Sequence, residues 1–143
     1  LLCRLFIPLL HQQPKAYILN IGSTTCYQAI PLMSVYAASK SFILRFSRAL
    51  HKELHKTNIS VTCFCPGTTE TDFAERARVN PKTVEKGKKV SMSPESVAKC
   101  AVKAMLTKKQ EVVPGFINKT TRFFAWLLPS NLIEKIAMDI YDQ

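Results

Sequence analysis

Three side chains in the first third of the sequence could act together on a carbonyl group: the hydroxyl of Ser23, the phenol of Tyr36 and the ammonium of Lys40. Tyr36 and Lys40 are four residues apart in a segment with a helical pattern, so their side chains share one helix face, about 5–6 Å apart at Cβ. Ser23 follows a short apolar run, where a strand should end. If they converge on one carbonyl, these groups could donate a hydrogen bond to its oxygen, exchange a proton with it and stabilise charge that develops there. We therefore predict a reaction centre at these three residues.

An alternation of strands and helices must hold this centre in place. Three short apolar runs rich in β-forming residues, at 16–21, 59–65 and 111–113, predict strands. Each run ends at chain-breaking residues: Gly22-Ser23, Pro66-Gly67 and Pro114-Gly115. The pattern is typical of a parallel sheet covered by helices, in which ligands bind outside the carboxyl ends of the strands. We expect these three pairs of chain-breaking residues to lie on one edge of the sheet.

Two helices are predicted in the first half of the chain. Residues 1–11 read as the end of a helix bent near Pro8, and a chain that starts inside a helix is expected to be a fragment. A long helix is predicted from about Ser34 to Lys56. Apolar residues spaced three and four apart form its predicted buried face: Ile43, Phe46, Leu50 and Leu54.

The second half of the chain contains a polar segment, residues 68–92, followed by further helices. Residues 68–92 are polar and lysine-rich, which predicts a mobile surface loop near the substrate. Ser93, with proline and an acid directly after it, is a typical helix start. Two amphipathic segments hinged at Pro129 are predicted to form a carboxy-terminal extension over 116–143.

The chain is strongly basic, with a formal charge of +10 and a pI near 9.6. This charge favours phosphate-bearing partners, but it does not choose between a nucleotide, a nucleic acid and a membrane. A nucleic-acid site would need basic residues interleaved with aromatic ones on one element, whereas the aromatics here gather near the carboxy terminus, so no nucleic-acid partner is expected. No apolar run reaches the roughly 18 residues of a membrane-spanning helix.

The cysteines predict buried free thiols. Their number is odd and they contain no Cys-x-x-Cys pair: Cys3, Cys26, Cys63, Cys65 and Cys100. Free thiols suit a reducing compartment, so we expect a cytoplasmic protein and no metal site. Cys63 and Cys65 alternate within a predicted strand and should share one of its faces.

Taken together, these segments resemble the carboxy-terminal half of the short-chain dehydrogenase/reductase family over almost the whole chain. The stretch ILNIGS matches the family's serine-bearing strand, and Tyr36-Ala-Ala-Ser-Lys40 matches its Tyr-x-x-x-Lys motif. The cofactor loop of the family is matched by Cys65-Pro66-Gly67-Thr68-Thr69-Glu70-Thr71, in which Thr69 replaces the usual apolar residue. The later part, from Glu111 onwards, is similar to a branch related to the hydroxysteroid and ketoacyl reductases.

The resemblance implies a Rossmann-type, doubly wound α/β fold, with residues 1–143 as the carboxy-terminal part of a single NAD(P)-binding domain. It implies hydride transfer between a nicotinamide cofactor and an apolar, steroid- or fatty-acyl-like carbonyl or secondary alcohol. The cofactor is expected to be NADP(H) or NAD(H), and the resemblance slightly favours NADP(H). Tyr36 would then be the acid in reduction and the base in oxidation. Lys40 would stabilise the phenolate and bind the nicotinamide ribose, while Ser23 would bind the substrate oxygen. Four further residues would hold the carboxamide and pyrophosphate of the cofactor: Pro66, Gly67, Thr69 and Thr71.

The chain departs from the family in its glycines. The phosphate-binding loop needs several closely spaced glycines after a strand, and the four present have no such spacing: Gly22, Gly67, Gly87 and Gly115. The chain by itself is therefore expected to bind cofactor poorly and to be inactive. The alternative interpretation is a non-catalytic remnant that serves as an interaction or dimerisation module. A homo-oligomer is expected for the complete protein.

The segment Phe116–Leu128 combines large apolar side chains with two cations, Lys119 and Arg122. Such a segment could line the entry for a lipid-like ketone or contact a membrane peripherally. It could equally cover the sheet or contact a second subunit, and the sequence leaves these alternatives open.

Overall fold

The computed structural model describes residues 1–77, 79, 81–88 and 90–141. Strands and helices alternate as the sequence predicts, with one 3₁₀ helix, η1, that the pattern does not reveal. In order, the elements are α1 (Leu2–His11), β1 (Ala16–Ile21), η1 (Thr24–Tyr27), α2 (Ser34–Glu53), β2 (Ile59–Phe64), α3 (Phe73–Arg76), α4 (Pro81–Lys88), α5 (Pro94–Leu106), β3 (Glu111–Val112), α6 (Phe116–Leu127) and α7 (Ser130–Tyr141).

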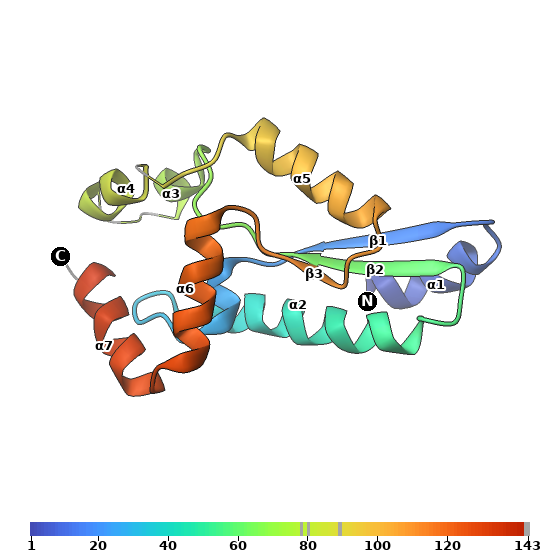
Figure 1. The fold of residues 1–143 in the computed structure, drawn as a ribbon, viewed down its shortest axis with the longest axis horizontal. Coiled ribbons are helices and arrows are strands. Elements are labelled where there is room, and N and C mark those ends of the chain that lie inside the picture. The colour runs from blue at the N-terminus through green and yellow to red at the C-terminus, as the bar shows by residue number, and fades with distance from the viewer. Residues whose placement is uncertain (78, 80, 89, 142–143) are drawn as a thin grey trace.

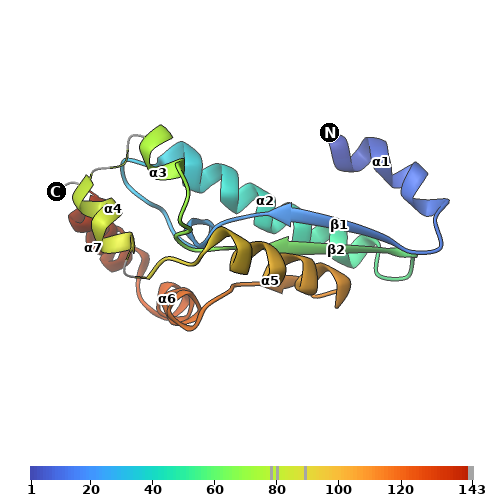
Figure 2. The same cartoon turned by 90° about the horizontal axis from the view of Figure 1, so that it is seen from above.

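The described strands form one parallel sheet in the order β1-β2-β3. β1 pairs with β2 along its full length, from Ala16 opposite Ile59 to Ile21 opposite Phe64. β3 pairs only with the end of β2, where Cys63 and Phe64 face Glu111 and Val112. Because the strands are parallel, their carboxyl ends meet at one edge, as predicted. Helices α3, α4 and α7 lie beyond that edge, and α1 lies beside the opposite end of the sheet (Figure 1 and Figure 2).

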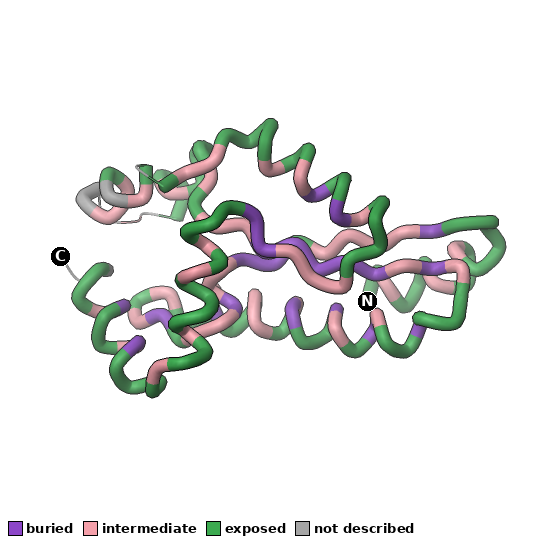
Figure 3. Tube along the Cα trace, in the orientation of Figure 1, coloured by how far each residue is buried: buried purple, intermediate pink, exposed green. Residues whose placement is uncertain are grey.

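Helices cover both faces of the sheet, which explains why β2 is an almost continuous apolar run. Ile59 and Val61 pack with residues of α1 and α2 on one face. Phe64 points to the other face and packs against Ala101 and Ala104 of α5. The burial is greatest along this central strand, while the outer sides of the helices are exposed (Figure 3).

The first helix is found at Leu2–His11, as predicted, with Pro8 inside it. Two details of the long helix are wrong. One is its end, because α2 ends at Glu53, earlier than Lys56. Phe46, predicted to be buried, is 38% exposed, whereas Ser47 beside it is fully buried. Ser47 donates to the Ile43 carbonyl at 2.7 Å and accepts a hydrogen bond from the Asn20 amide at 2.9 Å, so its hydroxyl is satisfied without water. A hydrophobicity pattern does not count such a serine as part of the core.

The polar segment 68–92 contains two short helices, α3 and α4. A parallel β-bridge between Thr69 and Met92 joins the two ends of this segment. Arg78, Asn80 and Lys89 in this segment lie outside the described residues. Directly after it, the Ser93 hydroxyl accepts a hydrogen bond from the Ser96 amide and caps α5, as predicted. Within the described residues, no helix is long and apolar enough to cross a membrane.

Candidate active site

A cavity of about 860 Å³ lies at the carboxyl ends of β1 and β2, beside the polar segment 68–92. Its walls are contributed by the end of β1, the start of α2, the loop after β2, and helices α3 and α4. All seven residues that the sequence singles out line this cavity: Ser23, Tyr36, Lys40, Pro66, Gly67, Thr69 and Thr71. The fold therefore brings them together, while the role of each residue stays a prediction.

Ser23 is held rigidly between two elements. It is 8% exposed, and its hydroxyl accepts a hydrogen bond from the Thr25 amide at 3.2 Å, which caps η1. The backbone on either side of it pairs with the segment after β2: the Gly22 amide donates to the Phe64 carbonyl at 2.8 Å, and the Thr24 amide to the Pro66 carbonyl at 2.9 Å. The β1–β2 pairing thus extends past the strand ends, and it fixes the Ser23 turn relative to Pro66.

Tyr36 and Lys40 lie one turn apart near the start of α2, with both side chains at the cavity. The Lys40 ammonium lies 5.7 Å from the centre of the Tyr36 ring and donates a hydrogen bond to the Ile21 carbonyl at 3.1 Å. This bond ties α2 to the last residue of β1. Phe73 of α3 also packs against the phenol, with its ring centre 5.4 Å from that of Tyr36. The Tyr36 ring therefore has both a cation and an aromatic side chain as neighbours.

The loop after β2 is supported by a residue that the sequence did not single out, Asn118 of α6. Its carboxamide nitrogen donates to the Pro114 carbonyl at 2.7 Å. A Cβ atom placed on Gly67 would lie only 2.2 Å from the Asn118 side-chain oxygen. Gly67 thus allows α6 to pack directly against the predicted cofactor loop. Gly67 and Asn118 are 51 residues apart, so no local sequence pattern predicts their contact. The contact depends on how α6 packs in the folded chain.

Substituting Gly67 by Ala should lower the free energy of unfolding by about 1 kcal/mol, because the methyl group would displace the Asn118 carboxamide and break its bond to Pro114. Urea denaturation measures the change. In an Asn118→Ala background the same Gly67→Ala substitution should cost much less, since nothing remains for the methyl group to displace. An equal loss in both backgrounds would rule out the clash as the cause.

Thr69 and Thr71 mainly order the backbone of this loop. The Thr69 hydroxyl donates to the Gly67 carbonyl at 3.3 Å, and the backbone next to Thr69 is tied to Met92 by hydrogen bonds of 3.1 Å. The Thr71 hydroxyl accepts a hydrogen bond from the Phe73 amide at 3.4 Å, just before α3. Both threonines line the cavity and remain candidates for cofactor binding.

A nearly buried carboxylate outside the cavity joins several of the elements around it. Glu111 of β3, whose side chain is 9% exposed, is bonded to Arg48 of α2 at 2.6 Å and to Arg122 of α6 at 3.0 Å. It also accepts a hydrogen bond from the Tyr27 hydroxyl at 2.5 Å. Burial and this hydrogen bond raise the pKa of Tyr27 above its ordinary value, so the phenol stays protonated as a donor. One carboxylate thereby joins η1, α2, β3 and α6.

Replacing Glu111 by Ala should lower the free energy of unfolding by about 2 kcal/mol, because the half-buried Tyr27 hydroxyl and the partly exposed Arg48 and Arg122 lose a shared, nearly buried partner. Chemical denaturation checks this. The matched control is Glu95→Ala, which removes an equally short 2.6 Å pair with Lys99 whose two side chains are 76% exposed. That pair should contribute less than about 1 kcal/mol. Equal losses for the two variants would contradict the anchoring role of Glu111.

Comparison with known proteins assigns the family. The family model described as short chain dehydrogenase matches residues 1–82, and the chain belongs to this family of oxidoreductases. It is 32% identical over 136 residues to the very-long-chain 3-oxoacyl-CoA reductase of Bos taurus, covering 94% of this chain and 40% of that protein. It is also 32% identical over 114 residues to the ketoacyl reductase HetN of Nostoc sp., covering 78% of this chain and 38% of that protein.

A solved structure supports the same fold assignment. The short-chain dehydrogenase from Sphingobium yanoikuyae in complex with NADPH superposes with a TM-score of 0.64 at 25% identity, over 80% of this chain and 43% of that protein. The predicted Rossmann-type α/β architecture is therefore confirmed. The chain spans about 40% of the length of the two curated relatives above.

Proposed function

We propose that the protein containing this chain transfers a hydride between a nicotinamide cofactor and a carbonyl or secondary alcohol. The observation that carries this proposal is the convergence of Ser23, Tyr36 and Lys40, from two different elements, on one cavity at the carboxyl edge of a parallel sheet. The family membership supports the reaction class.

In this proposal each of the three residues has a distinct task. Tyr36 gives its phenolic proton to the carbonyl oxygen in reduction and takes it back in oxidation. Lys40, 5.7 Å from the ring, supplies the positive charge that stabilises the phenolate, and in this proposal its ammonium also binds a ribose hydroxyl of the cofactor. Ser23 donates a hydrogen bond to the oxygen on which charge develops. Its hydroxyl proton is free for this, because the bond to Thr25 uses the oxygen only as an acceptor.

In this proposal the cavity holds the nicotinamide end of a dinucleotide. Pro66 and Gly67 line it together with the polar side chains of Thr69 and Thr71, a lining that suits a carboxamide and a phosphate. When bound, the cofactor would supply the hydride. Complex formation with NADPH by the Sphingobium yanoikuyae relative supports NADP(H) as the first cofactor to test.

An apolar substrate is favoured by the opposite wall of the cavity. Met33 from the turn before α2, Phe73 of α3 and Val84 of α4 line it, next to the Tyr36 ring. Two relatives are named as reductases of ketoacyl or 3-oxoacyl compounds, so we propose a fatty-acyl-like ketone, with a steroid-like ketone as the second class.

The experiment is a spectrophotometric assay of the protein produced from its complete reading frame. NADPH oxidation is followed with a long-chain 3-oxoacyl thioester, a steroid ketone and a short polar ketone. We expect turnover with the thioester and little with the polar ketone. If NADPH binds but none of the three ketones is reduced, the substrate class is wrong. If NADPH does not bind either, the alternative of a non-catalytic interaction module is favoured.

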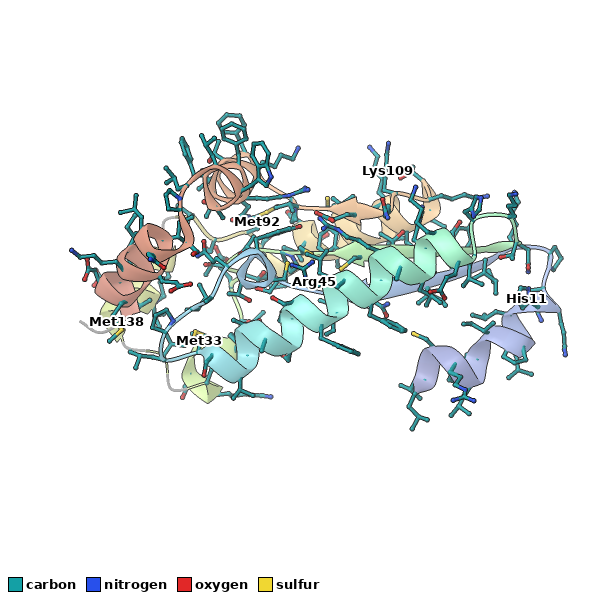
Figure 4. All side chains as sticks on the ribbon, turned by 90° about the horizontal axis from the view of Figure 1, so that it is seen from below. His11, Met33, Arg45, Met92, Lys109 and Met138 are labelled. Atoms are coloured by element: carbon teal, nitrogen blue, oxygen red, sulfur yellow. The ribbon has the colours of Figure 1, made fainter. Side chains whose placement is uncertain are left out.

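A second proposal concerns the outer side of α6, which we propose contacts a membrane surface. Its large apolar side chains are exposed rather than packed, with Phe116 at 81% and Trp126 at 78% exposure. Aromatic rings project from α6 away from the rest of the molecule (Figure 4). The segment Phe116–Leu127 has no acidic residue and carries the exposed Lys119, which suits the interface of an anionic bilayer, whereas Arg122 is paired with Glu111.

Flotation with liposomes containing anionic lipid tests this contact. The protein should float with the vesicles, and the double variant Phe116→Ser/Trp126→Ser should stay at the bottom of the gradient. The control is Phe42→Ser on α2, which removes a side chain of similar exposure, 68%, on a different element. Flotation that is absent in the unmodified protein, or unaffected by the α6 variant, would remove the proposal.

A further inference from the structure

Three of the five cysteines lie close together, next to the two segments that contribute Ser23 and Pro66 to the candidate site. The sulfur of Cys26, in η1, lies 3.8 Å from that of Cys65, which in turn lies 3.6 Å from the sulfur of Cys63. All three are buried, as predicted, and all five cysteines of the chain are free. Cys3 and Cys100 are only half-buried and lie outside this thiol cluster.

The cluster adjoins the cavity through a glycine. A Cβ atom on Gly22, which lines the cavity, would lie 2.7 Å from the Cys65 sulfur and 3.4 Å from that of Cys63. The absence of a side chain at this position therefore makes room for the sulfurs. Gly22, which lines the cavity, is therefore in direct contact with the Cys65 sulfur, although Cys65 itself is fully buried.

The geometry permits a disulfide between Cys26 and Cys65 and disfavours one between Cys63 and Cys65. Cys63 and Cys65 are two residues apart on extended backbone, so their Cβ atoms are about 6.6 Å apart and point in the same direction. A disulfide needs Cβ atoms about 3.5–4.5 Å apart. Cys26 comes from a different element and approaches Cys65 from the side of α2. Its sulfur needs to move only ~1.8 Å closer, from 3.8 Å, which rotation of the two side chains and a small shift of the loops can supply.

The two thiols of this pair are also unequal in acidity. Hydrogen bonds from Cys26 and Cys63 stabilise the Cys65 thiolate and hold the pKa of Cys65 below its ordinary value. The same hydrogen bond, together with burial, raises the pKa of Cys26. Cys65 is thus the nucleophile of the pair, and Cys26 is the protonated partner that can react second.

We propose that Cys26 and Cys65 are an oxidative modification site, which a peroxide converts to a disulfide. The Cys65 thiolate attacks one peroxide oxygen, the O–O bond breaks, and Cys65 becomes a sulfenic acid while hydroxide leaves and is protonated to water. The Cys26 sulfur then attacks the Cys65 sulfur and loses its proton, and the hydroxyl of the sulfenic acid leaves as a second water. Two thiols are oxidised and one peroxide is reduced to two waters.

The disulfide would act on the site because both cysteines adjoin it. Cys65 directly precedes Pro66, and Cys26 lies in the 3₁₀ helix that Ser23 caps. Drawing the sulfurs together pulls these two segments toward each other, and a displacement on the order of 1 Å at a reacting group can cost about 100-fold in rate. This consequence rests on the proposed function, whereas formation of the disulfide does not.

Peptide mapping tests the bond itself. The complete protein is treated with hydrogen peroxide, alkylated and digested with trypsin, which yields the peptides 16–40 and 57–76. We expect the two to be linked, with a mass two hydrogens below their sum. Because Cys63 and Cys65 share one peptide, the variants decide between them: the link should persist in Cys63→Ala and be lost in Cys65→Ala and Cys26→Ser. No link under conditions that oxidise Cys100, or a link that survives in Cys65→Ala, would overturn the proposal.

The effect on the site is measured separately, as NADPH affinity and turnover before and after peroxide and again after dithiothreitol. We expect turnover to fall at least about tenfold and to recover on reduction, with Cys65→Ala insensitive to peroxide. A mapped disulfide with unchanged turnover in an active protein would overturn the coupling to the site. A protein that is inactive before oxidation would instead count against the proposed function, and the mapped link would still stand.

Discussion

The Tyr36→Phe variant is expected to lose turnover by 10²–10⁴-fold while it retains cofactor affinity. Removing one oxygen abolishes the proton donor, but it leaves the ring that lies 5.4 Å from Phe73 and 5.7 Å from the Lys40 ammonium. The walls of the cavity should therefore persist. Steady-state reduction of the preferred ketone measures turnover, and fluorescence titration with NADPH measures affinity.

The matched control for this variant is Tyr17→Phe. Tyr17 lies on β1 and is half-buried, and it is not among the residues that line the cavity. Its variant should keep full activity. If Tyr36→Phe retains wild-type turnover while it is folded, Tyr36 is not the proton donor and another group in the cavity must carry the proton.

The Lys40→Ala variant is expected to lose both cofactor affinity and turnover, with kcat/KM lower by about 10²–10³-fold. The substitution removes the charge beside Tyr36 and also the 3.1 Å hydrogen bond that ties α2 to the Ile21 carbonyl. Two functions would thus disappear together, in contrast to the loss of turnover alone in Tyr36→Phe. NADPH titration and kinetics on the same sample separate the two effects.

Lys52→Ala provides the control, because this exposed lysine lies in the last turn of the same helix, far from the cavity. It should leave affinity and turnover unchanged. Lys40→Arg keeps the charge but presents a planar, bulkier group, so it should restore only part of the activity. Unchanged NADPH affinity in Lys40→Ala would argue against the ribose-binding role and leave Lys40 with the electrostatic role only.

Much of the fold could be predicted because local features mark it. Strand β1 ends at Ile21, just before the Gly22-Ser23 turn, and the Ser93 cap is found where the sequence placed it. Such features depend on residues close together in the chain, so the pattern reveals them. The errors, such as exposed Phe46 beside buried Ser47, arise because burial depends on what a helix packs against, and hydrophobicity is only a partial guide to that.

The sequence by itself determined the candidate chemistry. Residue types and spacing at Ser23, Tyr36 and Lys40 were sufficient to single out these residues, because one helix turn and one strand end set their neighbourhood. Only the tertiary structure decided what supports them. Asn118 against Gly67, Glu111 between two arginines, and the Cys26–Cys65 contact all join residues far apart in the chain. These contacts depend on how the helices pack on the sheet, and no periodic pattern in the local sequence predicts that packing.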